Sequence, residues 1–250
     1  FIVQASVQQS NFFGTGNTMG LQVSSGTVNK VASFSFTNPY YTVDGVSRGF
    51  DVYRRDVDGS TLGVNYKTST TGGAVRFGVP FTEYDTLFFG LGAENVKLHL
   101  DSSSPPRYLG FQNQFGATYA ALIGTAGWVR DTRDSAIWPT KGRVERTNLE
   151  LGTPLGDLEY WKYSYTHQYF YPYTRTITLV LSGELDSGDG YGGKPLPFFK
   201  NFYSGGIGSV RGFRTSSLGP RDVDQTRLGG NRKVNTSLEL LFPVPGSTLD

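Results

Sequence analysis

Two residues of this chain have the types and surroundings that a charge pair needs: an arginine in a glycine-rich segment and a glutamate on a later alternating segment. The glycine-rich segment contains Gly205, Gly206 and Gly208, followed by the motif Val210, Arg211, Gly212 and Phe213. Glu239 stands on the opposite face from Leu238 and Leu240, because successive side chains of a strand alternate. A bidentate Arg211–Glu239 pair would hold the segment in one orientation. A solvated surface arginine is the alternative, and the residues by themselves leave the two readings equal.

Other residues that could do chemistry lack partners at useful spacings. The two histidines, His99 and His167, have no serine placed for nucleophilic catalysis, so we expect no catalytic residues and no enzyme. Asp56 and Asp58 alternate but lack the rest of a calcium loop, so we expect a hairpin turn and no metal site. The segment 205–208 lacks the Gly-Lys-Ser/Thr ending of a phosphate-binding loop, so we expect no cofactor.

The elements that must position Arg211 and Glu239 show a period of two from end to end. In residues 176–186, for example, Ile177, Leu179 and Leu181 share one face while Glu184 is on the other. We found no convincing helical stripe. The predicted strands cover 1–11, 17–27, 31–38, 46–57, 61–79, 86–99, 114–130, 143–152, 159–171, 175–187 and 233–242. Several match or exceed the roughly 9–11 residues of a tilted membrane strand.

The connections between these segments alternate in character. Every second one is short and holds a proline beside aromatic or apolar residues, as at Pro39, Pro80, Pro139, Pro172 and Pro243. The others include the polar segment 102–107 and a long stretch from 187 to about 232. Short turns at one end and long loops at the other are typical of a transmembrane antiparallel β-barrel. A soluble β-sandwich is the alternative, and the strand lengths count against it.

Composition agrees with a barrel and excludes other classes. The chain of 250 residues is 14% aromatic, which suits interfacial girdles, and holds 33 glycines. It has no apolar run near the roughly 18 residues that a membrane helix needs. It has no cysteine, which excludes thiolate sites, and its net charge of +2 is far below that of a nucleic-acid binder. Because the predicted strands number an odd eleven and the chain begins and ends beside strands, we interpret it as part of a larger barrel.

The motif 210–213, with its context 198–220, resembles the signature loop of the BamA-type outer-membrane insertases of the bacterial surface antigen family. Segments 7–16, 36–45, 134–142 and 190–194 are similar to that family in the same order. The resemblance implies a barrel of sixteen strands, of which residues 1–250 would supply the second to twelfth. The first strand, the last four and the periplasmic POTRA domains would lie outside this chain. The resemblance also implies that Arg211 pairs inside the barrel with Glu239.

The resemblance implies that this is an integral outer-membrane protein of a Gram-negative cell that folds and inserts other β-barrel proteins through a lateral seam. Its expected partners are client outer-membrane β-barrels, accessory lipoproteins and outer-membrane lipids, with no nucleic acid and no cofactor. A two-partner-type secretion pore, which shares the loop signature, is the alternative. A passive porin is a third hypothesis.

Overall fold

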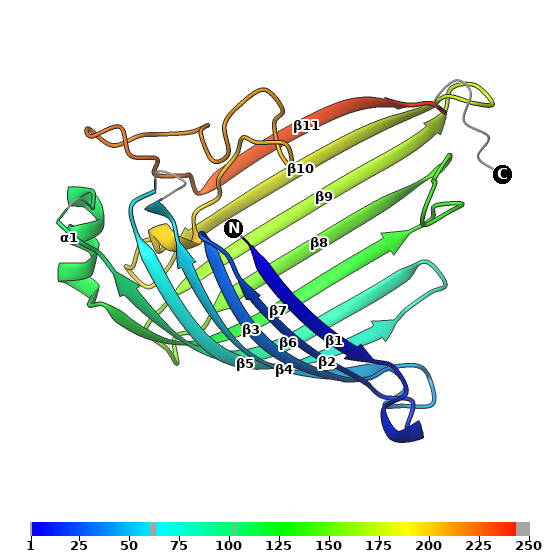
Figure 1. Cartoon of the computed structure of the whole chain (residues 1–250), viewed down its shortest axis with the longest axis horizontal. Coiled ribbons are helices and arrows are strands. Elements are labelled where there is room, and N and C mark those ends of the chain that lie inside the picture. Colours follow the sequence, from blue (N-terminus) through cyan, green and yellow to red (C-terminus); the bar gives the residue numbers. More distant parts are fainter. Residues whose placement is uncertain (1, 61–63, 103, 244–250) are drawn as a thin grey trace.

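Eleven strands form one antiparallel sheet in which each strand pairs with the next along the chain (Figure 1). The computed structural model describes residues 2–60, 64–102 and 104–243. The strands are β1 (Val3–Gln9), β2 (Thr18–Ser25), β3 (Asn29–Asn38), β4 (Ser47–Asp58), β5 (Lys67–Pro80), β6 (Asp85–His99), β7 (Thr118–Asp131), β8 (Gly142–Gly152), β9 (Tyr160–Pro172), β10 (Thr178–Gly190) and β11 (Arg232–Leu241). Each lies within, or within a few residues of, one predicted segment. The all-β, antiparallel fold is therefore confirmed.

One predicted boundary differs for a physical reason. The segment expected to begin a strand at residue 114 begins it at Thr118, because α1 (Pro106–Phe115) occupies the preceding residues. No convincing helical stripe marks this segment, so the helix was not predicted, and the predicted strand start at residue 114 was too early. Pro106 at the first helical position suits a helix start, and the buried Tyr108 gives the helix its packing contact. Residues 1, 61–63, 103 and 244–250, which belong to predicted strands, loops and the final turn, lie outside the described residues.

The sheet curves into a trough whose two ends differ (Figure 1). The predicted proline-containing turns after β3, β5, β7 and β9 lie together at one end, which we call the turn end. The other end, the loop end, holds α1 and the long connection between β10 and β11, residues 191–231. The predicted asymmetry of the connections is confirmed.

The two faces of the sheet have opposite polarity. The concave face holds polar residues of the strands, among them Glu94, Glu150 and Glu184, as well as the long connection. The convex face is apolar and exposed, as Leu91, Leu181 and other outward side chains show. Alternation along each strand produces this division. An apolar outer face with a polar interior is the arrangement of a membrane β-barrel wall.

The buried core lies at the loop end, between the concave face, α1 and the long connection. It contains Val64, Tyr66, Val96, Leu98, Tyr108, Tyr119, Ala121, Ile123, Leu158, Tyr160, Phe198 and Leu228. The rings of Tyr108 and Phe198 stack with centroids 3.9 Å apart, and Tyr66 meets Phe198 edge to face at 5.2 Å. This aromatic contact fixes the start of the long connection against α1.

In the described part of the chain, no helix has the length and apolar character needed to cross a membrane.

Candidate functional site: the internal loop and its anchors

Residues 191–231, the internal loop, carry the predicted signature motif. Within it, the backbone turns tightly where Gly206 N–H donates to Val210 O at 3.2 Å and Ser209 N–H donates to Gly206 O at 3.1 Å. Val210 is half-buried in this turn, whereas Phe213 is 54% exposed. The turn therefore presents the motif without burying it.

Two of the three predicted loop glycines are required by the backbone. Gly205 and Gly206 have φ of 107° and 102°, values that side-chain-bearing residues rarely adopt. A Cβ on Gly205 would also lie 2.6 Å from the carbonyl oxygen of Arg214. Gly208 has neither a positive φ nor a neighbour within 4 Å of an added Cβ. Gly212, inside the motif, has φ 86°.

The structure brings Arg211 and Glu239 to the same cavity, of about 540 Å³, on the concave face. Glu239 lies opposite Val180 in the β10–β11 register, on the inward side as predicted. In the described part of the chain, no ion pair links the two side chains. Their direct pairing stays a prediction, while their shared cavity is an observation.

The internal loop is instead tied to this part of the wall by a hydrogen-bonded cluster that the sequence analysis did not identify. Ser204 Oγ lies 2.8 Å from Asn235 Oδ1 and donates to it, and Asn235 Nδ2 donates to Ser209 Oγ at 3.0 Å. Asn235 Nδ2 also donates to Glu184 Oε2 at 2.9 Å. The amide of Asn235 thus joins the loop to strands β10 and β11. We call Ser204, Ser209, Asn235 and Glu184 the asparagine anchor.

A lysine completes the base of the asparagine anchor. Lys233 Nζ lies 2.6 Å from Glu184 Oε1 and 2.7 Å from Asp186 Oδ2. The lysine side chain is 15% exposed and that of Asp186 is 4% exposed. Because both carboxylates face the same ammonium, Glu184 is held in place to accept from Asn235.

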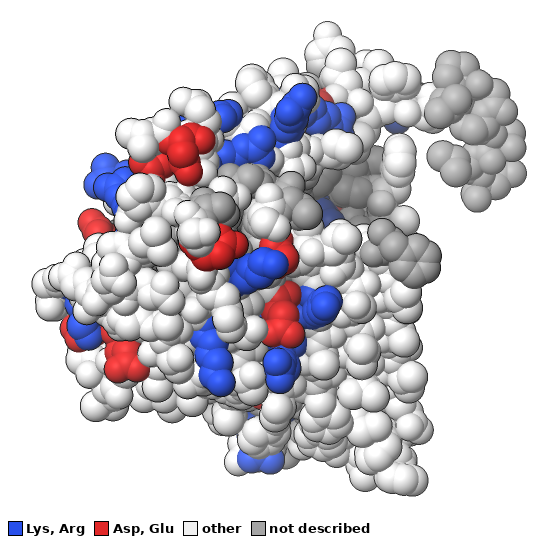
Figure 2. All heavy atoms as spheres, turned by 60° about the vertical axis from the view of Figure 1, so that its left-hand side comes forward, with Lys and Arg blue, Asp and Glu red and all other residues white. Residues whose placement is uncertain are grey.

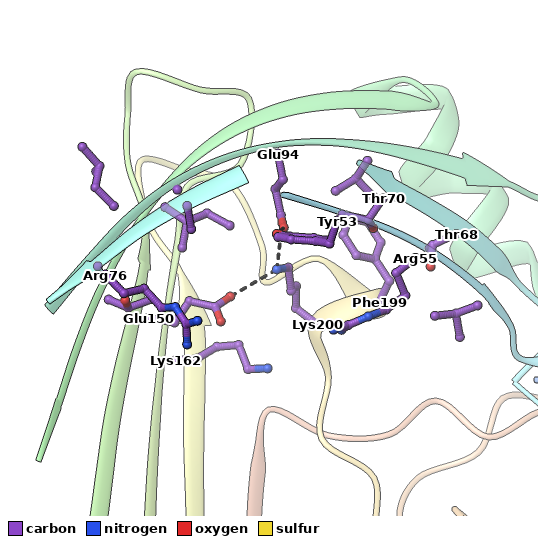
Figure 3. A pocket seen from close by; sticks show the side chains of 18 residues that line it. Tyr53, Arg55, Thr68, Thr70, Arg76, Glu94, Glu150, Lys162, Phe199 and Lys200 are labelled. Atoms are coloured by element: carbon purple, nitrogen blue, oxygen red, sulfur yellow. Dashed lines mark hydrogen bonds and ion pairs between the residues drawn. The ribbon is translucent and has the colours of Figure 1, made fainter. Parts of the chain in front are cut away.

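A second anchor, the lysine anchor, holds the loop a few residues earlier in the chain (Figure 3). Lys200 belongs to the short helix η3 (Phe198–Lys200), and its Nζ lies 3.1 Å from Glu94 Oε1 on β6 and 3.1 Å from Glu150 Oε1 on β8. The hydroxyl of Tyr53 donates to Glu94 Oε2 at 3.0 Å, and that of Tyr160 donates to Glu150. A single lysine therefore links the loop to side chains from four strands.

The charge of Lys200 is stabilised where it lies. Burial by itself would lower the pKa of the ammonium, but the neighbouring Glu150 carboxylate and the groups beside it raise that pKa above its ordinary value. The side chains of Lys200 and Glu94 are 18% and 9% exposed, so water screens the pair weakly. The lysine anchor stands beside a cavity of about 440 Å³, which Arg55, Arg76 and Lys162 also line.

Both anchors escaped the sequence analysis because their partners are far apart in the chain. A signal was present in the segment 198–202, where Lys200 is a lone cation among phenylalanines. Outside the anchors, Figure 2 shows acidic and basic side chains interspersed over the end that carries α1 and the internal loop, without a large area of one sign. No cluster of three or more His, Cys, Asp or Glu suited to a metal occurs in residues 2–60, 64–102 and 104–243.

A curved antiparallel wall with an apolar outer face and an internally anchored loop defines part of an integral outer-membrane β-barrel protein. The chain belongs to the Omp85 superfamily, whose domain matches residues 11–250. The resemblance noted in the sequence is thereby confirmed, as is the outer-membrane location.

Individual relatives agree with this membership. The chain is 42% identical, over 262 residues, to the outer membrane protein assembly factor BamA of Neisseria meningitidis serogroup B, an alignment covering 98% of this chain and 33% of that protein. The chain thus spans a third of the length of this curated relative.

Two solved structures share the fold. The crystal structure of BamA from Haemophilus ducreyi lacking POTRA domains 1–3 matches with a TM-score of 0.90 and 28% identity, covering 99% of this chain and 51% of that one. CdiB from Escherichia coli matches with a TM-score of 0.59 and 14% identity over 98% of this chain and 46% of that one, a likeness of fold alone.

Proposed function

We propose that the whole protein folds and inserts β-barrel proteins into the outer membrane, without enzymatic catalysis or a cofactor. The 42% identity to a BamA over 98% of this chain carries the proposal. Its partners in this proposal are client β-barrel proteins, accessory outer-membrane lipoproteins and the surrounding lipids. The residues 1–250 supply part of the barrel domain, and the strands that close it and the POTRA domains belong to the rest of the protein.

The chemistry requires strand pairing and no covalent step. A barrel with a weak lateral seam offers unpaired backbone N–H and C=O groups, and an incoming client strand can add to that edge. Burial of the client's apolar surface and closure of its own hydrogen bonds supply the free energy, so no nucleotide is needed. A short hydrophobic belt would also thin the bilayer at the seam.

The internal loop contributes a fixed structure on the inner wall. The lysine anchor and the asparagine anchor support this role, because they hold the first half of the loop, at Lys200, Ser204 and Ser209, on strands β6, β8, β10 and β11. In our proposal Arg211 adds a third link by pairing with Glu239 across the cavity that both line. The motif would then face the interior of the barrel at a fixed position along the barrel axis.

Arg211→Ala in the whole protein tests this role, with Arg214→Ala as the matched control. Both arginines are exposed in the same loop, and Arg214 does not line the cavity of Glu239. We expect Arg211→Ala to slow client assembly into liposomes and to speed proteolysis of the loop, with Arg214→Ala close to wild type. Equal assembly and proteolysis in both variants would count against the proposal.

A double-mutant cycle with Glu239→Gln tests the pairing itself. If Arg211 and Glu239 interact directly, their coupling in loop stability should reach about 1 kcal/mol or more. A coupling near zero would show that Arg211 does not pair with Glu239. The assembly function would then still be tested by the liposome assay.

A secretion pore of the two-partner type is the second candidate, and the fold likeness to CdiB favours considering it. Single-channel conductance separates the two functions. A pore should conduct steadily without clients and export a dedicated partner, whereas an assembly factor should accelerate folding of several unrelated β-barrels.

A further inference from the structure

A row of charged side chains crosses the convex face of the sheet near the turn end. Asp85 on β6 lies opposite Arg130 on β7, Arg130 lies opposite Glu145 on β8, and Glu145 lies opposite His167 on β9. All four point away from the concave wall, because the inward positions of these strands are those of Glu94, Ile123, Glu150 and Lys162, and alternation puts the row on the other face. We call these four residues, with Arg143, the outer charge row.

The outer charge row borders an apolar belt. Farther from the turn end, the outward positions of β6 and β7 hold apolar residues: Leu87, Phe89, Leu91, Leu122 and Ala126. Trp128 and Tyr165 flank the row, and Trp128 Nε1 donates to Asp85 Oδ1 at 3.0 Å while Tyr165 Oη donates to Glu145 Oε1 at 3.2 Å. Trp and Tyr concentrate where the hydrocarbon of a bilayer meets its headgroups. The row therefore lies at headgroup level on a lipid-facing surface.

The carboxylates of the row already have their hydrogen bonds. Asp85 accepts from Thr82 Oγ1 at 2.6 Å as well as from Trp128, and its side chain is 10% exposed. Glu145 lies 3.1 Å from Arg143 Nε and 3.4 Å from His167 Nδ1, and is 13% exposed. Neither carboxylate is left open to a cation from the lipid.

The arginines, in contrast, keep unused donors. Arg130 Nη1 is 3.6 Å from Asp85 Oδ2, beyond a good hydrogen bond, and Arg130 Nε is buried without a hydrogen-bond partner. Arg143 contacts Glu145 through Nε, and its side chain is 44% exposed. Because Arg130 lies opposite Glu145 and Arg143 lies two residues before it on the same face, the two guanidiniums are diagonal neighbours. Guanidinium donors at headgroup level suit phosphate oxygens.

We propose that Arg130 and Arg143 bind the phosphate of a phospholipid headgroup on the outer wall of the barrel. Asp85 and Glu145 orient the two arginines, and Trp128 and Tyr165 set the depth at which the headgroup sits. The site depends on the membrane placement of the wall and is independent of the proposed assembly function. It would give the barrel a fixed lipid contact on strands β6 to β9.

Native mass spectrometry of the whole protein with added phosphatidylethanolamine tests the site. The double variant Arg130→Gln and Arg143→Gln should bind the first lipid about tenfold more weakly than wild type, because two charge-assisted contacts to phosphate are lost. Arg54→Gln is the matched control, since Arg54 lies on the convex face of β4 and pairs with Asp56 at 3.6 Å. It should leave lipid binding unchanged.

Heat-modifiable migration on gels verifies that each variant is folded. If the double variant fails to fold, Arg143→Gln serves in its place, since Arg143 is the more exposed of the two. Lipid binding equal to that of Arg54→Gln would overturn the proposal. Displacement of the lipid by inorganic phosphate would also overturn it, because the site would then recognise a free anion. The double variant could also bind lipid as the wild type does and yet lose a bound accessory protein from its mass spectrum. That result would show that the row contacts a protein, and it would overturn the lipid assignment.

Discussion

Lys200 Nζ lies 3.1 Å from Glu150 Oε1, and this contact joins the internal loop to the inner wall of the sheet. The same ammonium lies 3.1 Å from Glu94 Oε1. Because Lys200 comes from the loop and the two glutamates come from β6 and β8, the contact fixes the loop across the width of a third strand, β7.

Replacing Lys200 with methionine should destabilise the loop strongly. The change removes the ammonium that lies between Glu94 and Glu150, and breaking a buried pair in this way costs about 3–5 kcal/mol. We expect faster proteolysis within residues 191–231 and a lower midpoint in urea unfolding. Lys200→Arg keeps the positive charge and should therefore keep part of the loop's stability. The exposed Lys141→Met should change neither the proteolysis rate nor the urea midpoint. Wild-type behaviour of Lys200→Met would show that the aromatic core at the loop end holds the loop by itself.

Asn235→Asp should release the loop around Ser204 and Ser209. The change removes the donor to Glu184 and Ser209 and adds a carboxylate beside an existing one, and we expect a loss of about 1–3 kcal/mol. Proteolysis near Ser209, followed by mass spectrometry, measures the release. The control is Asn231→Asp, at an exposed position that lacks side-chain hydrogen bonds to the described residues. Equal cleavage in the two variants would exclude Asn235 as an anchor.

Gly205→Ala and Gly208→Ala should differ although the residues are three apart. At Gly205 the positive φ and the nearby Arg214 carbonyl oppose a Cβ, and strain of this kind costs about 1–3 kcal/mol. Gly208 has open space and an ordinary backbone, so its substitution should be nearly neutral. The stability of the two variants is compared by the temperature at which each loses the gel migration of the folded barrel. Similar temperatures would contradict the role assigned to the Gly205 conformation.

Asp134, in the connection between β7 and β8, should titrate well below an ordinary aspartate. The hydroxyl of Thr140 and then its backbone N–H, at 2.9 Å from Asp134 Oδ1, lower the pKa to about 2. Because the folded pKa is depressed, the stabilisation is fully present above the unfolded pKa of about 4 and is lost as the pH falls toward 2. Carbon-13 NMR of the carboxyl measures the midpoint, and Thr140→Val should raise it. A midpoint near 4 in the unmodified protein would contradict the hydrogen bonding.

The eleven strands, their turns and the inward face of Glu239 followed from the sequence, because alternation and proline placement are local properties. The sequence did not reveal α1, since its helix is stabilised through Tyr108 against Phe198, a contact made only in the folded chain.

Only the tertiary structure decided which charges meet. The strand register places Asp85, Arg130 and Glu145 in one row and brings Lys200 to Glu94 and Glu150. The alternating pattern tells which face a residue occupies but not its height along a neighbouring strand. The residue types of Arg211 and Glu239 could suggest a pair. The structure showed that they share a cavity, whereas Asn235 and Lys200 make the hydrogen bonds that hold the loop. Which side chains meet depends on the path of the loop across the concave wall, and that path is set only in the folded chain.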